Sequence, residues 1–315
     1  MLGRLDCVRP DSCFSGCPMR RDCPHCNAKA KTSDDRIQVI RDGSFWRKSD
    51  GRLIIKFKCR ACGKHFSHAT FAKEYRQKKR HKNERIKNLL GERCSIRGIA
   101  RIERLSRTTV LRKLKFLGPI ALVELQEMNH ARKPITRLQF DDQETAEQSK
   151  YKPLAISLAV EEGSRWIAGF EVSEMPVKWK MSPRKRALYG NRKDMRAEGR
   201  RLLFARIKLF LDPKVTIISD QHPHYPKSIR EHFPLATHVR HKSRRPIDHG
   251  QDELKQGFDP MFSLNHTCAK NRDRVARLTR KSWCLSKKKE HLVYHLAIAF
   301  VRHNKSLPCN ESQRK

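Results

Sequence analysis

Apolar and polar residues alternate with two different periods in the second half of the chain. Runs rich in β-branched and aromatic residues predict five strands, at residues 135–141, 153–160, 165–172, 215–220 and 237–240. Segments with apolar residues at helical spacing predict helices at residues 202–211, 228–233, 265 onward and 285–304. The order β-β-β-α-β-α-β-α predicts an α/β domain.

The segment that precedes this domain predicts two short helices crossing at an angle. Ile99 and Leu105 suit their inner faces, and Ser106 is a favourable N-cap for the second helix, at residues 106–117. The turn position that often holds Gly is Arg104 here. The pattern resembles a helix-turn-helix, and an ordinary helical hairpin packed inside the protein is the alternative.

Two of the predicted strands end in a carboxylate, at Asp141 and at Asp220. Strands of this kind can bring both side chains to the same edge of a sheet. Hard cations such as Mg²⁺ take oxygen ligands, and paired metals stabilise the attacking and leaving oxygens of a phosphoryl displacement. Asp142 is expected to face solvent or to support Asp141. The alternative for the pair is strand-end capping or salt bridging to the many Lys and Arg residues.

Cysteine spacing near the N-terminus predicts a structural zinc site. Two C-x₂-C pairs, Cys23 with Cys26 and Cys59 with Cys62, supply the four thiolates of a tetrahedral shell. The β-like segments between the pairs suit a zinc ribbon, whose folding the metal would drive. A redox or metal-free role is the alternative. A second group of cysteines fits no single template and is expected to be a free tail: Cys7, Cys13 and Cys17.

The charge of the chain points to a polyanionic partner. Lys and Arg number 70 against 33 Asp and Glu, which gives a formal net charge of +37. Neutralising phosphates releases counter-ions and drives binding, so double-stranded DNA is the expected partner. A recognition helix contacts bases with its N-terminal residues, which makes Arg107, Thr108 and Arg112 the candidate DNA readers. An RNA-binding zinc-ribbon protein would leave the two Asp-ended strands unexplained.

A membrane surface is the competing polyanion. No stretch approaches the roughly twenty apolar residues that a spanning helix needs, and the N-terminus lacks the apolar core of a signal peptide. We therefore expect no membrane partner and a cytoplasmic, nucleoid-associated protein.

The order of these parts resembles a family of mobile-element enzymes. Together with the segments at residues 262–268, 274–278 and 283–287, it is similar to insertion-sequence transposases that join a zinc ribbon, a helix-turn-helix and an RNase H-like catalytic domain of the DDE type. The resemblance covers about residues 23–304. It implies an RNase H-like mixed five-stranded sheet with flanking helices. It also implies cleavage of element ends and joining of the freed 3′-hydroxyls to target DNA, with Asp141 and Asp220 as the first two catalytic residues and Mg²⁺ or Mn²⁺ as the metal.

The third catalytic residue has two candidates. The family's glutamate is absent from the matching place on the C-terminal helix, where Asn265 stands. Glu253 offers a carboxylate, which binds a hard cation more strongly than an amide oxygen does. We predict Asn265 because it matches the family signature. Its lack of charge supports the alternative function, a catalytically inactive, sequence-specific DNA-binding protein derived from a transposase.

These predictions divide the chain into four parts. A cysteine-rich tail and zinc ribbon occupy residues 1–72, and a basic linker and helix-turn-helix occupy residues 73–130. The RNase H-like catalytic domain is expected at residues 131–305 and a short tail at residues 306–315. We expect the chain to form a homo-oligomer when it assembles on element ends and target DNA.

Overall fold

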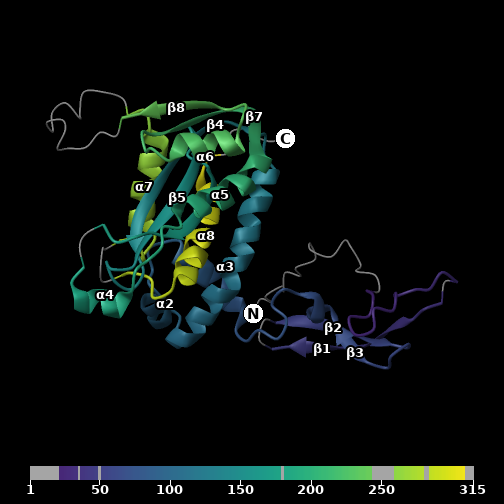
Figure 1. Ribbon diagram of the computed structural model, residues 1–315. Helices are drawn as coiled ribbons and strands as arrows, with labels where there is room; N and C mark the ends of the chain where they lie inside the picture. The colour runs from purple at the N-terminus through teal and green to yellow at the C-terminus, as the bar shows by residue number, and fades with distance from the viewer. Residues whose placement is uncertain are drawn as a thin grey trace, which may run out of the picture. The chain divides into compact units, whose positions relative to one another are not determined.

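The chain forms two compact units, Met1–Lys82 and Asn83–Lys315 (Figure 1). The structure, a computed structural model, describes residues 21–34, 36–48, 51–178, 181–242, 259–279 and 284–308. None of the described helices is long and apolar enough to span a membrane.

The N-terminal unit is built on a three-stranded antiparallel sheet. Its strands β1 (Val39–Arg47), β2 (Arg52–Cys59) and β3 (His65–Ser67) lie in that order, and 3₁₀ turns follow at His68–Phe71 and Arg80–Lys82. Its core is small, with Val39, Phe57 and Phe66 packed beside the cysteine side chains. So small a core needs an additional source of folding energy.

The second unit begins with three helices. They are α1 (Asn83–Leu90), α2 (Ile96–Ile102) and α3 (Arg107–His130). Apolar side chains of all three, including Ile86, Ile99 and Leu114, belong to one buried core with the larger sheet of this unit. The helices therefore fold as part of the larger unit.

The sheet of this unit has five strands in the order β6-β5-β4-β7-β8. The strands are β4 (Ile135–Ala146), β5 (Pro153–Glu161), β6 (Ile167–Glu174), β7 (Leu211–Asp220) and β8 (Thr237–His241). β4, β5 and β6 pair antiparallel, whereas β7 lies parallel to both β4 and β8. This is the RNase H-like mixed sheet that the sequence predicts.

Helices cover both faces of the sheet. On one face, α5 (Arg196–Ile207) and α6 (Tyr225–His232) pack on Phe140 and Ile217. On the other, α3, α7 (Phe262–Arg274) and α8 (Lys289–Ser306) pack on side chains of β5 and β6 (Figure 1). A short helix, α4 (Pro183–Tyr189), and a 3₁₀ turn (Lys208–Phe210) complete the connections.

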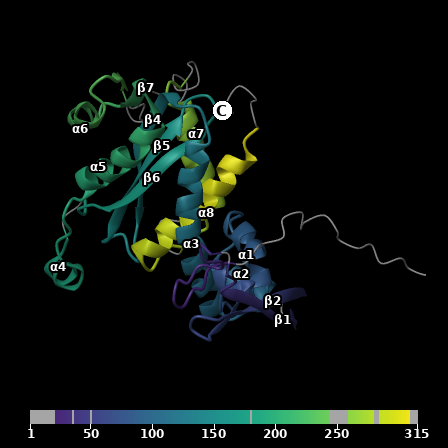
Figure 2. The same ribbon diagram turned by 90° about the vertical axis from the view of Figure 1, so that its right-hand side faces the viewer.

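Helices α3 and α8 lie side by side, as the second view shows (Figure 2). Gly118 permits the close approach, because a Cβ there would lie 2.3 Å from the Cβ of Tyr294. Asn129, near the end of α3, donates to the carbonyl of Ala168 at 2.9 Å and accepts from the indole of Trp166 at 2.7 Å. These bonds anchor the end of α3 to β6.

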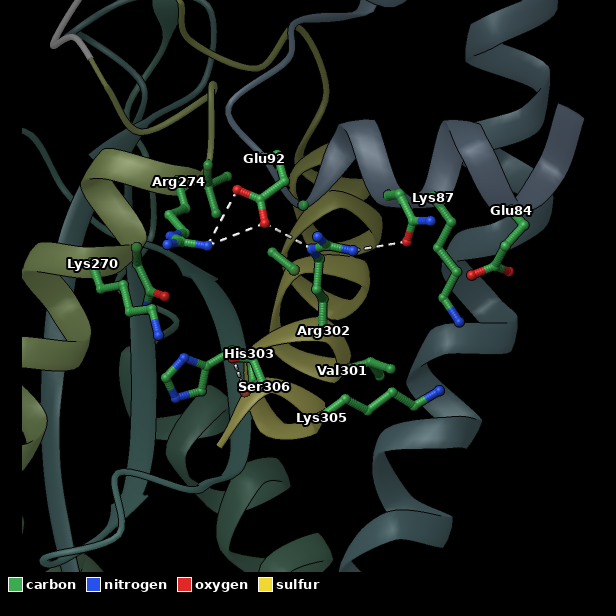
Figure 3. Close-up of a pocket in the computed structure, with 15 residues that line it drawn as sticks. Glu84, Lys87, Glu92, Lys270, Arg274, Val301, Arg302, His303, Lys305 and Ser306 are labelled. Atoms are coloured by element: carbon green, nitrogen blue, oxygen red, sulfur yellow. Dashed lines mark hydrogen bonds and ion pairs between the residues drawn. The ribbon is translucent and has the colours of Figure 1, made fainter. Parts of the chain in front are cut away.

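A shared carboxylate joins the loop after α1 to α7 and α8. Glu92 accepts from Arg274 of α7 at 3.1 Å and from Arg302 of α8 at 2.9 Å (Figure 3). The Arg302 guanidinium also donates to the Asn88 side chain at 2.8 Å. Partly exposed pairs of this kind contribute little stability individually, but together they fix how the three segments meet.

Several element bounds differ from the sequence prediction. β4 does not stop at Asp141 but continues to Ala146, because residues 138–146 pair with β5. The second helix of the predicted helix-turn-helix does not end near residue 117 but runs to His130. α5 starts at Arg196 rather than residue 202, and α7 starts at Phe262, so Asn265 lies inside its first turn.

Candidate functional site

Asp141 and Asp220 lie next to each other on adjacent parallel strands. The register of β4 and β7 pairs Phe140 with Ser219, and the two aspartates are the next residues of their strands. Parallel pairing in register keeps such residues on the same side of the sheet. The structure therefore brings together the two carboxylates that the sequence singles out.

Hydrogen bonds hold each of these carboxylates in place. Oδ1 of Asp141 accepts from the backbone N–H of Asp142 at 2.7 Å and from the Tyr225 hydroxyl at 3.2 Å. Oδ1 of Asp220 accepts from the backbone N–H of His222 at 2.9 Å. Each residue keeps its other carboxylate oxygen, Oδ2, without a protein hydrogen bond in the described part of the chain.

Burial of Asp141 and its repulsion by the neighbouring carboxylates favour the binding of a cation at this pair. Burial, together with the neighbouring charges of Asp220 and Asp142, raises the pKa of Asp141 to about 7. Burial also raises the pKa of Tyr225, so the phenol stays protonated and remains a donor to Asp141. Two converging carboxylates with free oxygens fit a hard divalent cation such as Mg²⁺ or Mn²⁺.

Asp142 belongs to a different set of contacts from Asp141. It pairs in register with Ser157 of β5, whose hydroxyl donates to its carboxylate. Nη1 of Arg200, a buried residue of α5, lies 3.5 Å from the other carboxylate oxygen. Asp142 is thus tied to protein groups, as expected of a residue that supports the site.

Asn265 lies on the helix that passes beside the carboxylates. Burial and the nearby charge of Asp141 raise the pKa of Cys268 to about 12. Cys268 lies one turn after Asn265 on α7, so this helix passes close to Asp141. The Asn265 side chain itself is exposed, and its amide donates to Asp259 at 2.8 Å. Asp259 in turn accepts from the backbone N–H of Met261 at 2.9 Å, at the start of α7.

The identity of the third ligand stays a prediction. In the described part of the chain, no hydrogen bond joins Asn265 to Asp141 or Asp220. Glu253, the other candidate, lies outside the described residues. Among the described His, Cys, Asp and Glu side chains, no third group completes a metal cluster around the two aspartates.

Three supporting residues escape the sequence analysis. Tyr225 follows Asp220 in the His-Pro-His-Tyr-Pro segment, and a phenol near a catalytic strand gives no pattern of its own. Arg200 lies in a stretch that resembles a basic surface loop, yet it is only 3% exposed. Asp259 lies two residues before Met261, the N-cap of α7, and its bond to the Met261 N–H is an Asx turn, for which an Asp before a helix is the sequence signal.

The four predicted zinc ligands come together in the N-terminal unit. The Sγ atoms of Cys23, Cys26, Cys59 and Cys62 all lie within 4.8 Å of one another. The sulfurs of Cys23 and Cys62 are 3.7 Å apart, as are those of Cys26 and Cys59. A tetrahedral shell with Zn–S bonds of about 2.3 Å places sulfurs about 3.8 Å apart, so the cluster could hold zinc. Cys7, Cys13 and Cys17 lie outside the described residues.

The two halves of this thiolate cluster have the same backbone geometry. Asn27 donates to the carbonyl of Cys23 at 2.9 Å, and Gly63 donates to that of Cys59 at 2.9 Å. Both donors have a positive φ, 58° at Asn27 and 69° at Gly63, a conformation that Asn and Gly adopt most readily. The repeated turn orients each pair of thiolates toward the other.

The start of α3 presents the predicted DNA readers to solvent. The Ser106 hydroxyl accepts from the N–H of Thr109 at 3.1 Å, which confirms it as the N-cap of α3. Arg104, in the turn between α2 and α3, has a positive φ of 50°, a conformation that Gly adopts more readily than other residues. The side chains of all three predicted readers are exposed: Arg107, Thr108 and Arg112.

Comparison with known proteins adds little to this geometry. No protein-family model and no curated protein matches the chain. The crystal structure of the Mos1 Strand Transfer Complex overlaps it at 11% identity and a TM-score of 0.23, over 71% of this chain and 76% of that one. The catalytic domain of Mos1 mariner transposase overlaps at 10% identity and a TM-score of 0.21, over 61% and 90%. These scores are low, and the fold class rests on the strand order and register.

Proposed function

We propose that the chain is a metal-dependent DNA transposase of an insertion sequence. It would cleave the ends of its element and join the freed 3′-hydroxyls to target DNA. The observation that carries the proposal is the alignment of Asp141 with Asp220 on adjacent parallel strands of an RNase H-like sheet. The net charge of +37 favours DNA as the substrate.

The catalytic residues in this proposal are Asp141, Asp220 and Asn265, which would hold Mg²⁺ or Mn²⁺. Such a cation, when bound, lowers the pKa of a water or hydroxyl and stabilises the charge of a leaving oxygen. The Tyr225 hydroxyl and the N–H of Asp142 fix the orientation of the Asp141 carboxylate. Phosphoryl transfer needs mainly such positioning and charge stabilisation from a protein.

Other parts of the chain would bind DNA. The exposed start of α3 suits entry into a major groove, with Arg107, Thr108 and Arg112 as base-reading side chains. Zinc in the cysteine cluster would stabilise the N-terminal unit. We further propose that the chain assembles as a homo-oligomer on double-stranded DNA, in the cytoplasm with the nucleoid.

End cleavage by substituted proteins tests the catalytic assignment. The substrate is a duplex with the inverted repeats that border the gene, and each protein is first checked for folding and DNA binding. Asp220→Asn and Asn265→Ala should abolish cleavage, whereas Glu253→Gln should cleave as the wild type does. Normal cleavage by Asn265→Ala with loss in Glu253→Gln would assign the third ligand to Glu253. Full activity of Asp220→Asn would refute the proposed site altogether.

A DNA-binding protein without catalysis is the second candidate. The exposed Asn265 side chain, bonded to Asp259, favours it because a neutral amide leaves the site one charge short. Nicking of end-containing DNA with Mg²⁺ or Mn²⁺ separates the two functions. Tight binding of the ends with no nicking under either metal would support the second candidate.

A further inference from the structure

A cavity of about 280 Å³ lies where the C-terminal ends of α1, α7 and α8 meet (Figure 3). Its cationic lining residues are Lys87, Lys270, Arg274, Arg302 and Lys305. Neither Asp141 nor Asp220 lines it, so the cavity is separate from the proposed catalytic site. Its role is therefore a separate question.

Positive charge exceeds negative charge around this cavity. Glu92 is shared by Arg274 and Arg302. Glu124, just beyond the lining, is shared by Lys87 and Lys305. Glu84 is the other carboxylate of the lining. Glu84, Glu92 and Glu124 therefore give three negative charges against the five positive charges of the lining. Each helix end that meets here adds about half a negative charge, so a small excess of positive charge remains.

The excess is concentrated at Lys270. This residue makes no ion pair within the described part of the chain. Burial lowers the pKa of Lys270, as do the positive charges of Arg274 and Arg165, and the carboxylate of Glu92 offsets only part of this effect. Arg165 adds a further cation, and its Nη1 lies 3.4 Å from Nδ1 of the His266 ring. An anion here would relieve the repulsion among these groups.

A buried donor also lines the cavity without a partner. Asn271 is only 4% exposed, and its Nδ2 group has no acceptor among the described residues. A buried donor left without an acceptor is destabilising. A ligand oxygen in the cavity would satisfy it.

We propose that this cavity binds a phosphate of a DNA backbone, with the Lys270 ammonium, the Arg274 guanidinium and the Asn271 amide as donors. A phosphate offers several acceptor oxygens and suits this mixture of charged and neutral donors. The net charge of +37 selects a nucleic acid over an acidic peptide. The proposal rests on the proposed function only in taking DNA as the polyanion.

Binding of random-sequence duplex by the full-length protein, without divalent metal, tests the contact. Lys270→Gln should weaken binding uniformly across sequences and lower the slope of log K against log salt by about one. Lys208→Gln is the control, because it removes the same charge from an exposed lysine that does not line the cavity. Equal losses in the two variants would overturn the proposal. Cleavage is not measured, so a failure here is distinct from a failure of catalysis.

A second pair of measurements does not depend on removing Lys270. Asn271→Asp keeps the side-chain shape but adds a negative charge, and should weaken duplex binding more than Asn271→Ala does. Acetylation of Lys270 in the wild-type protein should be slowed by duplex DNA, whereas Lys208 is acetylated at an unchanged rate. Equal protection of Lys270 by inorganic phosphate or polyglutamate, at matched charge and ionic strength, would overturn the assignment to a DNA backbone. So would unprotected acetylation of Lys270 in the DNA complex.

Discussion

Ionisation of Asp141 makes stability depend on pH, and would do the same for cation binding at the proposed site. The pKa of Asp141 is about 7 in the folded protein against an ordinary value of 3.8, because of burial and the nearby carboxylates Asp220 and Asp142. Between these pH values the folded state holds a proton that the unfolded state has released. Stability therefore falls as the pH rises from about 4 to about 7 and stays lower above that. A cation competes with the same proton, so its binding strengthens as the pH rises through about 7.

Asp141→Asn should therefore stabilise the metal-free protein at high pH. The substitution removes a buried charge that is present only above pH 7, so the gain is small at pH 4–5. At pH 8 it should reach a few kcal/mol, since each unit of pKa shift corresponds to about 1.4 kcal/mol. Thermal melts across this pH range measure the effect. Glu127→Gln, at an exposed position of α3, is the control and should show no such pH dependence.

Asn265 and Asp259 form a pair that should respond to substitution together. Asn265→Glu alone sets two carboxylates at the 2.8 Å contact with Asp259, so we expect lower stability and little gain in metal binding. Adding Asp259→Asn removes the repulsion and leaves the site one carboxylate richer. The double variant should bind Mn²⁺ more tightly than the wild type, on the order of tenfold. Calorimetric titration measures this, and unchanged Mn²⁺ affinity in the double variant would exclude position 265 from the metal site.

The sequence singles out the two aspartates of the candidate site and Asp142 beside them, but not the residues from other elements that support them. Asp141 and Asp220 can be predicted because each follows a strand of β-favouring residues, and parallel strands align their ends. The partners of the site depend on tertiary packing. Arg200 reads as part of a charged loop and becomes meaningful only when α5 buries it beside Asp142. The same is true of Tyr225, which reaches Asp141 from α6.

At the scale of elements, α3 shows why boundaries are harder to predict than existence. Gly118 and Pro119 are signals that usually end a helix, and they limit the prediction to residue 117. The helix continues because contacts outside it compensate: Gly118 lies against Tyr294 of α8, and Asn129 bonds to β6. Local propensity is overridden by packing at this point.

Gly118→Ala tests the contact between α3 and α8. Helix propensity alone would favour Ala by about 1 kcal/mol. The added Cβ, however, would meet the Cβ of Tyr294 at 2.3 Å, so the helices must move apart. We expect a net loss of about 1–3 kcal/mol in urea unfolding. Gly98→Ala in α2 is the control, because its Cβ meets only the Ser95 hydroxyl at 3.4 Å and should be neutral or stabilising.

Arg107→Ala tests the start of α3 as a recognition element. A bidentate contact to a base contributes about 1–3 kcal/mol of discrimination. The variant should lose that much affinity for the element's own ends and less for random duplex, as measured by competition binding. Equal losses on both DNAs would make Arg107 a phosphate contact. Ser106→Ala serves as a comparison, because it removes the helix cap and keeps the Arg107 side chain.

At the scale of the molecule, the two compact units should respond to metal loss separately. The small core of the first unit depends on four thiolates, whereas the second unit has extended cores on both faces of its sheet. The cysteine spacing alone predicts the first unit. The packing of α1, α2 and α3 into the second unit could not be predicted, because amphipathic helices do not reveal which surface they cover.

Combining Cys59→Ser with Cys62→Ser should remove about one zinc per chain and unfold the N-terminal unit. The second unit should keep its own unfolding transition, since the thiolate cluster lies within Met1–Lys82. Metal analysis and calorimetry measure both effects. Cys94→Ser is the control, because Cys94 lies outside the cluster. Full zinc content in the double variant would contradict the assignment.

The continuity of α3 sets a fixed length within the second unit. Its 24 residues span about 36 Å, close to the 34–36 Å of one turn of B-form DNA. The helix begins at the exposed arginines and is bonded to β6 near its other end. It therefore sets both the distance and the rotation between these two ends. One residue inserted into it would turn its two ends by about 100° relative to each other. In the proposed transposase, the distance between the bases that α3 contacts and the bond that is cut would then depend on the length of this helix.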